Sequence, residues 1–157
     1  MNTEIRVDLT KLVEGMDDAK ERLIASMVKG VGKGVRQAEA AAKANLKGDL
    51  RGKHLMSSIH YEVKADGALV TGKVGVGAAT GIEGDAGEMF GIYVHEGTGI
   101  YSRTGMGRQN VPWSYRDDDG EWHITSGMTS NPFLENAYNA EKDNVQRLIA
   151  AELMAGE

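Results

Sequence analysis

One change in the spacing of apolar residues constrains the fold of this chain more than any other feature of its sequence. From Leu9 to Leu46 the apolar residues recur at intervals of three and four, which is the period of an amphipathic helix. From Ser58 the interval becomes two, which is the period of a half-buried strand. The sequence therefore predicts a long N-terminal helix that is followed by a β-sheet.

The long helix is predicted to begin after Asp8, whose carboxylate can cap the first turn, and to stop near Gly48. Its weak point is a run of three glycines, Gly30, Gly32 and Gly34. Each glycine costs about 1 kcal/mol relative to alanine in a helix interior. We therefore expect a bend at these glycines, or two helices that meet end to end.

Two β-hairpins are predicted in the middle of the chain. In the first, residues 58–65 and 70–76 alternate between apolar and polar side chains around Asp66-Gly67, a strong two-residue turn signal. In the second, aromatic and apolar residues in the segments 113–115 and 122–124 flank the acidic turn 117–120. Both patterns favour antiparallel pairing.

Two glycine-rich segments lie between these hairpins. Residues 77–91 are expected to form a long acidic loop, and residues 97–110 a second loop that carries two arginines. Between them, Ile92–Glu96 is a brief apolar run that is expected to form a short strand. Long glycine-rich loops in compact domains are often binding elements, so we expect the second loop, with its two arginines, to order against a neighbouring subunit.

A second long helix is predicted at the C-terminus, where Asn131 can cap it and Pro132 fits its first turn. The order of elements favours an α+β fold, in which an antiparallel β-sheet has long N-terminal and C-terminal α-helices packed on one face. The length of 157 residues fits a single domain. Residues 1–7 of that domain are expected to be flexible.

The composition argues against several classes of function. The chain has no cysteine, which excludes disulfides and thiolate metal sites. Its formal net charge of −5 argues against a broad basic face for nucleic acid. No apolar run approaches the roughly 18 residues that span a bilayer, and the N-terminus lacks the layout of a signal peptide. We therefore expect a soluble protein that is made in a cytoplasm and has no membrane partner.

His95 and Glu96 match the first half of an H-E-x-x-H zinc motif, but Gly99 stands where the second histidine belongs. Convergence of His95, Glu96 and His123 in the folded chain would instead give a metal-dependent hydrolase or nuclease, which is the alternative function. The polar end of a strand is the simpler interpretation of His95-Glu96. The acidic turn lacks EF-hand spacing, and residues 72–81 lack both phosphate-loop patterns.

Arg103 and Arg108 lie near Tyr101 in the second glycine-rich loop. Arginines of this kind contact phosphate or the carboxylate of a partner. A DNA-contacting module that uses both is a third hypothesis. In a chain of net negative charge, contact with a neighbouring subunit is favoured over contact with DNA.

Three short motifs follow the long helix in a fixed order. The segment 51–59 carries Leu55, Ser58 and Ile59, the segment 93–98 reads Tyr-Val-His-Glu-Gly-Thr, and the segment 130–134 reads Ser-Asn-Pro-Phe-Leu. Together they resemble the HK97 gp10-like family of tailed-bacteriophage proteins. The resemblance extends over about residues 8–153, so it covers nearly the whole chain.

The chain also departs from the pattern of that family. Gly52 lies one residue too early, the segment 46–49 replaces the usual proline-valine-aspartate lead-in, and Ser130 stands where the family has a first proline. The departure near Gly48 concerns the connection between the first helix and the sheet.

The resemblance implies a structural virion protein and not an enzyme. Such a protein forms an oligomeric ring, expected to be a hexamer, at the neck or upper end of the tail, through which DNA passes. Its implied partners are its own copies, the head-connector or stopper proteins, and the tail-terminator or tail-tube proteins. It would be found in the virion, and in the host cytoplasm during assembly. No cofactor is implied.

The motifs and the second loop together give the candidate interface residues. No catalytic, cofactor-binding or metal-binding residue is assigned beside them. The interface candidates are Tyr93, Glu96, Thr98, Tyr101, Arg103, Arg108, Pro132 and Phe133.

Overall fold

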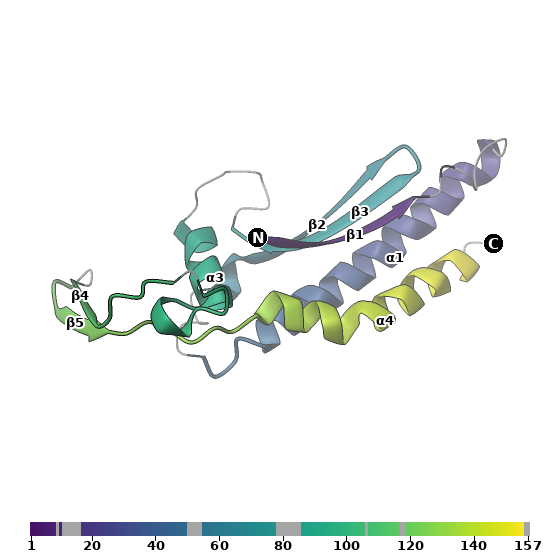
Figure 1. Ribbon diagram of the computed structural model, residues 1–157. Helices are drawn as coiled ribbons and strands as arrows, with labels where there is room; N and C mark the ends of the chain where they lie inside the picture. Colours follow the sequence, from purple (N-terminus) through teal and green to yellow (C-terminus); the bar gives the residue numbers. More distant parts are fainter. Residues whose placement is uncertain are drawn as a thin grey trace.

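A computed structural model gives the fold of the chain. It describes residues 1–8, 10, 17–49, 55–77, 86–105, 107–116 and 119–155. The molecule is elongated, with a three-stranded sheet and two long helices toward one end and a two-stranded hairpin at the other (Figure 1). Helices and antiparallel sheets occur together, which confirms the predicted α+β class.

The larger sheet contains β1 (Asn2–Asp8), β2 (Ile59–Asp66) and β3 (Leu69–Val76) in the order β1-β3-β2. Both pairings are antiparallel, so β3 is the central strand. The side chains of β3 alternate strictly between buried and half-buried, as the sequence predicted for its valines. The first hairpin is therefore confirmed.

The N-terminal residues differ from the expectation. Residues 1–7 were expected to be flexible, but Asn2–Asp8 forms β1, an edge strand that pairs with β3 along its whole length. The reason is a period of two in the second half of the segment, where Ile5 and Val7 are half-buried and Arg6 and Asp8 are exposed. The first long helix is therefore not the first element of the fold.

The turn of the first hairpin lies one residue later than its sequence signal. Asp66 pairs with Leu69, so Gly67 and Ala68 are the central residues of the turn. Gly67 has a φ of +58°, and no residue other than glycine has a positive φ among the described residues. Glycine at the first central position with a positive φ is typical of a type II′ turn, whose twist matches that of the flanking strands.

Helix α1 spans Asp17–Ala44 without interruption, so the three glycines do not divide it. Residues 9 and 11–16, where the sequence placed the helix start, lie outside the described residues. The Asp8 carboxylate accepts hydrogen bonds from Thr10 N at 2.9 Å and Thr10 Oγ1 at 2.6 Å, and these bonds lower the pKa of Asp8. The cap predicted for Asp8 stays a prediction, because the residues that would form the first helical turn lie outside the described ranges.

Two of the three glycines of α1, Gly30 and Gly34, are explained by close packing. A Cβ atom on Gly30 would lie 2.8 Å from Cα of Ile149, and one on Gly34 would lie 2.6 Å from Cγ1 of Val145. Both contacts are with helix α4 (Phe133–Ala155), which packs along α1. Because glycine lacks a side chain, the two helix backbones approach closely on this face.

The core lies between α1, α4 and the sheet. Fully buried Val31 and Val35 of α1 face β3, where a Cβ on Gly72 would lie 2.6 Å from Cγ1 of either valine. The short 3-10 helix η1 (Met56–Ser58) leads from the long helix into β2. The core contains side chains from most elements of the body, in chain order Met27, Val31, Val35, Leu55, Ile59, Val70, Val74, Val94 and Phe133.

The short strand expected at Ile92–Glu96 is wrong, because this run is the end of helix α3 (Ala86–Glu96). Gly91, Val94 and His95 are buried at helical spacing, while the residues between them are exposed. A brief apolar run has no periodicity that separates strand from helix. The expected loop 77–91 is consequently shorter, because α3 begins at Ala86, and residues 78–85 lie outside the described residues.

The second predicted hairpin is confirmed by β4 (Trp113–Arg116) and β5 (Trp122–Thr125), which form their own two-stranded sheet. We call residues 113–125 the arm. The arm projects from the end of the molecule opposite to the tip of the first hairpin (Figure 1). Between α3 and the arm, the segment 97–110 is irregular apart from the short 3-10 helix η2 (Gly99–Tyr101).

Candidate interface at the glycine junction and the arm

The segments around Gly97 and Gly127 are far apart in the chain but are joined by backbone hydrogen bonds. Thr98 N donates to Met128 O at 2.8 Å, and Met128 N donates to Thr98 O at 3.2 Å. Nearby, Ile100 N donates to Ser126 O at 3.2 Å. We call this unit, residues 94–101 and 126–131, the glycine junction.

Three glycines make this close approach possible. Gly97, Gly99 and Gly127 have φ values of +75°, +61° and +122°, which L side chains rarely adopt. A Cβ atom would lie 2.6 Å from Tyr101 O at Gly97, 2.1 Å from Ser126 O at Gly99, and 2.1 Å from Thr98 O at Gly127. Glycine is therefore required by the fold at all three positions.

The junction is tied to both long helices through two asparagines. Asn131 N donates to Val94 O at 2.8 Å, which fixes the end of α3. The Asn131 amide donates to Asn45 O at 3.2 Å and to Asp49 Oδ2 at 3.3 Å, while Asn45 Nδ2 donates to Phe133 O at 3.0 Å. The side chain of Asn131 thus bridges the ends of α1 and α4, in place of the cap predicted from the sequence.

Phe133, one of the predicted interface residues, is fully buried. Its ring packs edge-to-face against His95, with the ring centroids 5.6 Å apart. Phe133 therefore contributes to the core and positions the start of α4. Pro132, the neighbouring prediction, is half-buried beside it.

Four charged or titratable side chains form a chain of contacts at the edge of the junction. His95 Nδ1 lies 2.8 Å from Glu96 Oε1, and Arg103 Nε lies 3.7 Å from Glu96 Oε2. Arg103 Nη2 lies 2.7 Å from Glu135 Oε2 on α4, and this hydrogen bond raises the pKa of Arg103. The Arg103 N–H also donates to Glu96 O at 2.9 Å. The contacts hold the second loop against α4.

The three residues of the metal hypothesis do not all come together. His95 and Glu96 are in contact at the end of α3, whereas His123 lies on the arm and stacks on Tyr115 with the ring centroids 5.3 Å apart. Within the described ranges, no group of three or more histidine, aspartate or glutamate side chains is arranged to hold a metal ion.

The remaining predicted residues are at least partly exposed. Tyr93 and Tyr101 are each 47% exposed, and Thr98 uses its backbone in the junction. The guanidinium of Arg108 lies 5.2 Å from the ring centroid of Trp113, which is a cation–π contact. Arg108 therefore connects the second loop to the first strand of the arm.

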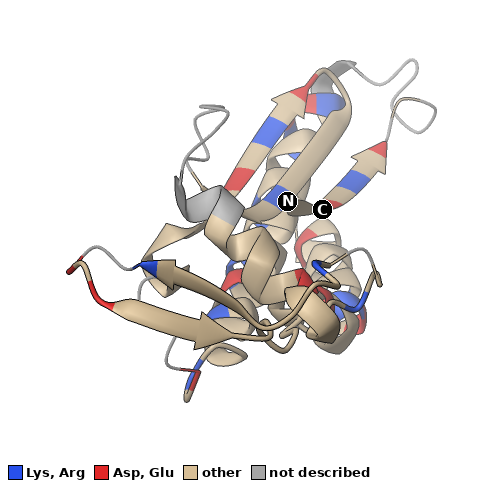
Figure 2. Cartoon of the chain, turned by 60° about the vertical axis from the view of Figure 1, so that its left-hand side comes forward, with Lys and Arg blue, Asp and Glu red and all other residues tan. Residues whose placement is uncertain are grey.

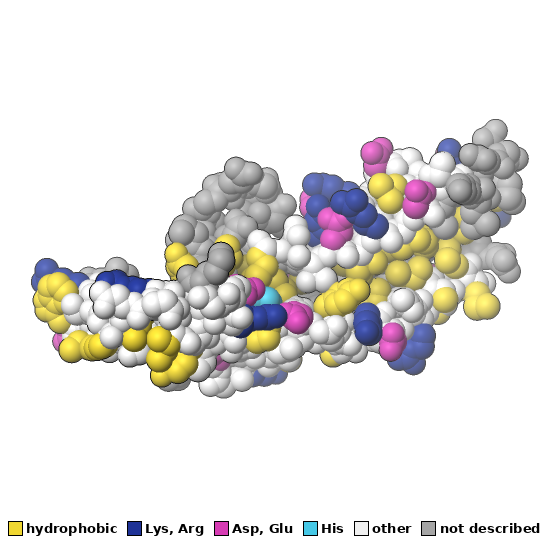
Figure 3. Space-filling view, in the orientation of Figure 1, with side chains coloured by type: hydrophobic (Ala, Val, Ile, Leu, Met, Phe, Trp, Pro, Cys, Tyr) yellow, Lys and Arg dark blue, Asp and Glu magenta, His cyan; other side chains and the backbone are white. Residues whose placement is uncertain are grey.

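Sequence reasoning did not assign the apolar residues of the arm to a site. Trp122 is 70% exposed and Ile124 is 77% exposed, and Tyr115 is exposed as well. Apolar side chains cover much of the arm in the space-filling view (Figure 3). The available signal was the presence of aromatic residues on both strands of a hairpin with no further strand to cover them.

Charge is distributed unevenly along the arm. Acidic side chains lie at its tip, where Asp119 and Glu121 are exposed, and Arg116 lies at the end of β4 (Figure 2). Arg116 Nε donates to Gly120 O at 2.7 Å, which closes the turn. The arm therefore presents an apolar middle and a polar tip.

Comparison of the chain with known protein families, curated proteins and solved structures found no match.

None of the helices in the described parts of the chain is long and apolar enough to cross a membrane.

Proposed function

We propose that this chain is a non-enzymatic structural subunit of a tailed-bacteriophage virion. In this proposal it forms an oligomeric ring at the head–tail junction or at the top of the tail, where DNA passes through. The role in the neck or in tail completion comes from the ordered motifs that resemble the HK97 gp10-like family. The partners implied are other copies of the chain, the head-connector or stopper proteins, and the tail-terminator or tail-tube proteins.

The observation that carries the proposal is the concentration of exposed apolar side chains at the arm-bearing end. Among the described residues, eight of the twelve large apolar side chains with substantial exposure lie between Phe90 and Ile124. Exposed apolar patches with polar surroundings mark protein–protein contact sites. Aromatic residues are also enriched at the centres of such interfaces.

The arm supports the same proposal through its size. An isolated two-stranded hairpin is marginally stable at best in water, because it has no second layer on which to bury its side chains. The strands β4 and β5 pair only with each other among the described residues. Contact with another protein would supply the missing layer.

Subunits of a cyclic ring larger than a dimer touch through two different surfaces, which meet head to tail and close by rotation. We expect a hexamer from the resemblance. The net charge of −5 suits a channel through which DNA slides, because a basic lumen would hold the phosphates.

Native mass measured over a range of protein concentrations tests self-association. We expect concentration-dependent rings by light scattering and by negative-stain microscopy. The double variant Trp122→Ser with Ile124→Ser should associate more weakly, because it removes the two most exposed apolar side chains of the arm. Tyr61→Ser on β2 is the matched control, since it removes an exposed aromatic residue from the body. A wild-type protein that stays monomeric up to its solubility limit contradicts the proposal.

The virion role has a separate test in the phage genome that encodes the chain. We expect the gene to lie between the head-connector genes and the major tail genes. Deletion of the gene should leave heads and tails that fail to join, or tails that are unstable. Normal infectious particles after deletion would refute the role.

The alternative function, a metal-dependent hydrolase or nuclease that uses His95, Glu96 and His123, is supported by the contact between His95 and Glu96 alone. Calorimetric titration with zinc or manganese tests it. Saturable binding that is lost in His123→Ala would favour the alternative over the structural role. Heat of binding that is absent at millimolar metal rejects it.

A further inference from the structure

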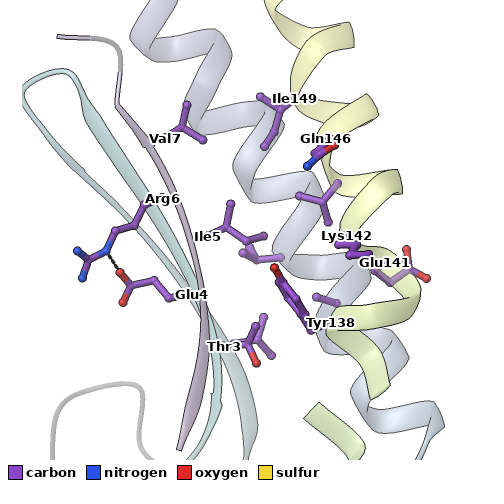
Figure 4. Close-up of a pocket in the computed structure, with 14 residues that line it drawn as sticks. Thr3, Glu4, Ile5, Arg6, Val7, Tyr138, Glu141, Lys142, Gln146 and Ile149 are labelled. Atoms are coloured by element: carbon purple, nitrogen blue, oxygen red, sulfur yellow. Dashed lines mark hydrogen bonds and ion pairs between the residues drawn. The ribbon is translucent and has the colours of Figure 1, made fainter. Parts of the chain in front are cut away.

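An apolar groove runs between strand β1 and helix α4. Its volume is about 280 Å³, and it is open to solvent along one side. Figure 4 shows Ile5 and Val7 of β1 facing Tyr138 and Ile149 of α4 across this space. Val35 and Val74 also line it. We call this space the β1–α4 groove.

The groove exists because strand β1 and helix α4 pack on different neighbours. Strand β1 is an edge strand that pairs with β3 only. Helix α4 is drawn onto α1 at Gly30 and Gly34, so its closest packing is with α1. The inward side chains of β1 are left half-buried, because α4 borders this strand without covering it.

The dimensions of the groove favour protein side chains over a cofactor. Pockets for drug-sized molecules usually have volumes of about 300 to 1,000 Å³ and bury most of the ligand surface. The β1–α4 groove lies at the lower end of that range, and because it is open along one side it would leave much of such a ligand in contact with water. Glu141 and Lys142 of α4 lie along it beside an apolar floor, and Glu4 and Arg6 of β1 also border it. Figure 4 shows Glu4 and Arg6 paired with each other on the side of β1 that is turned away from α4, which leaves Glu141 and Lys142 as the charged groups on the α4 side of the groove.

The arm has the chemistry that fits this groove. Trp122 and Ile124 are two residues apart on β5, so both side chains project from the same face of the hairpin. Arg116 pairs directly with Trp122 and lies on that same face, and the acidic tip follows with Asp119. An apolar pair flanked by a cation and by carboxylates is complementary to an apolar groove flanked by Glu141 and Lys142.

The positions of the arm and of the β1–α4 groove show which molecule can place an arm in the groove. The arm projects from one end of the elongated molecule, and the β1–α4 groove lies in the body toward the other end (Figure 1). The arm of a chain is therefore directed away from the groove of that same chain. A second copy of the chain can supply the arm.

We propose that the arm of one copy inserts Trp122 and Ile124 into the β1–α4 groove of the next copy. The inference rests on the proposed function as a ring subunit, and it identifies the two surfaces that meet in the ring. The contact is heterologous, because the arm meets the groove and not another arm, so it closes into a ring or continues as a filament.

Cysteine cross-linking tests the contact directly, because the chain has no cysteine of its own. One variant carries Ile124→Cys on the arm, and a second carries Gln146→Cys beside the groove. Oxidation of the mixture should give a cross-linked dimer of the two variants at least about tenfold faster than the control, because association raises the effective thiol concentration to the millimolar range. Each variant alone should remain largely uncross-linked.

The control mixture pairs Ile124→Cys with Ala65→Cys. Ala65 is exposed on β2, the opposite edge of the same sheet, so it matches Gln146 in exposure but not in place. A second measurement uses Trp113→Phe, which leaves Trp122 as the only tryptophan. The emission of Trp122 should shift to shorter wavelength as the protein concentration rises, because the indole ring leaves water.

Three results would overturn the inference. The first is equal cross-linking of the arm with Gln146→Cys and with Ala65→Cys. The second is cross-linking of Ile124→Cys mainly with itself. The third is a small apolar molecule bound to the monomer in the groove, detected by native mass spectrometry. Rings that form without the arm-to-groove cross-link overturn the inference and leave the proposed function standing. Arm-to-groove cross-linking in a protein whose deletion does not affect phage assembly supports the inference and contradicts the proposed function.

Discussion

At the scale of single residues, the glycines of this chain fall into groups that the sequence alone does not separate. Gly30 and Gly34 face α4 at contact distance, whereas a Cβ on Gly32 would meet nothing within 4 Å. Gly99 has a positive φ and no space for a side chain, while Gly105 has a similar φ of +69° and open space around it. Pairs of this kind allow packing and backbone strain to be measured separately.

The glycines of α1 should respond to alanine in opposite directions. We expect Gly32→Ala to raise the free energy of unfolding by about 0.5 to 1 kcal/mol, because alanine has the higher helix propensity. Gly30→Ala should lower it by about 1 to 3 kcal/mol, because the new methyl meets the backbone of Ile149. Gly34→Ala should cost less, since Val145 can turn its side chain. Denaturant titration measures all three, and an unchanged Gly30→Ala variant contradicts this account of the helix pair.

The glycine junction should be more sensitive than a free turn. Gly105→Ala should cost about 1 to 2 kcal/mol, which is the strain of a left-handed conformation in an L residue. Gly99→Ala carries the same strain and also places a methyl 2.1 Å from Ser126 O, so it should cost at least about 1 to 3 kcal/mol more. Thermal and denaturant unfolding give the difference between the two variants. Equal costs would mean that the backbone of the junction moves apart easily.

At the scale of elements, the predictions from sequence were best where an apolar pattern extended over many residues or where a turn signal separated two strands. Helix α4 and both hairpins were identified, because a long helical stripe or a flanked turn leaves little choice. Strand β1 was missed because seven residues at the chain start have no turn signal, and their partner β3 lies about seventy residues later. Helix α3 was assigned as a strand because its apolar run is short. In both cases distant packing decided the structure.

The candidate site was also predictable only in part. The segments 93–98 and 130–134 were singled out from the sequence, and they do converge, because Asn131 N donates to Val94 O. Their backbone contacts depend on φ values and on distances across the fold, which no single-sequence pattern contains. The exposure of Trp122 could not be predicted, because alternation in a hairpin does not tell which face has a partner.

The ion pair between Lys33 of α1 and Glu152 of α4 predicts a pH dependence at this scale. The hydrogen bond from Lys33 lowers the pKa of Glu152 below its ordinary value of 4.5. The stabilisation is therefore complete above the ordinary glutamate pKa, and it is lost as the pH falls through the lowered pKa of the folded state. In Lys33→Gln, the pKa of Glu152 should rise toward its ordinary value in a carboxyl carbon NMR titration.

The matched control for this titration is Lys47→Gln, which removes the same charge from an exposed position beyond the end of α1. It should leave the pKa of Glu152 where it is. A Glu152 titration that is the same in wild type and in Lys33→Gln contradicts the pairing of the two helices through this contact.

At the scale of the whole molecule, the body and the arm differ in how they are stabilised. The core residues lie in the body and at the glycine junction, and the arm contributes none of them. We expect the backbone amides of residues 113–125 to exchange hydrogen quickly in dilute protein, while those of β3 exchange slowly. Raising the concentration should protect the arm as copies associate. Hydrogen exchange followed by mass spectrometry measures both, and an arm that is protected in the monomer contradicts the prediction.

The pairing of β1 with β3 also has a consequence for synthesis on the ribosome. Strand β1 is translated before β3, and its hydrogen-bonding partner is complete only when Val76 has been translated. Local structure such as α1 forms earlier, because contacts between near neighbours in sequence close small loops. Strand β1 must therefore remain unpaired while α1 and the β2–β3 hairpin are made. A bulky fusion placed before Met1 would therefore slow the pairing of β1 with β3.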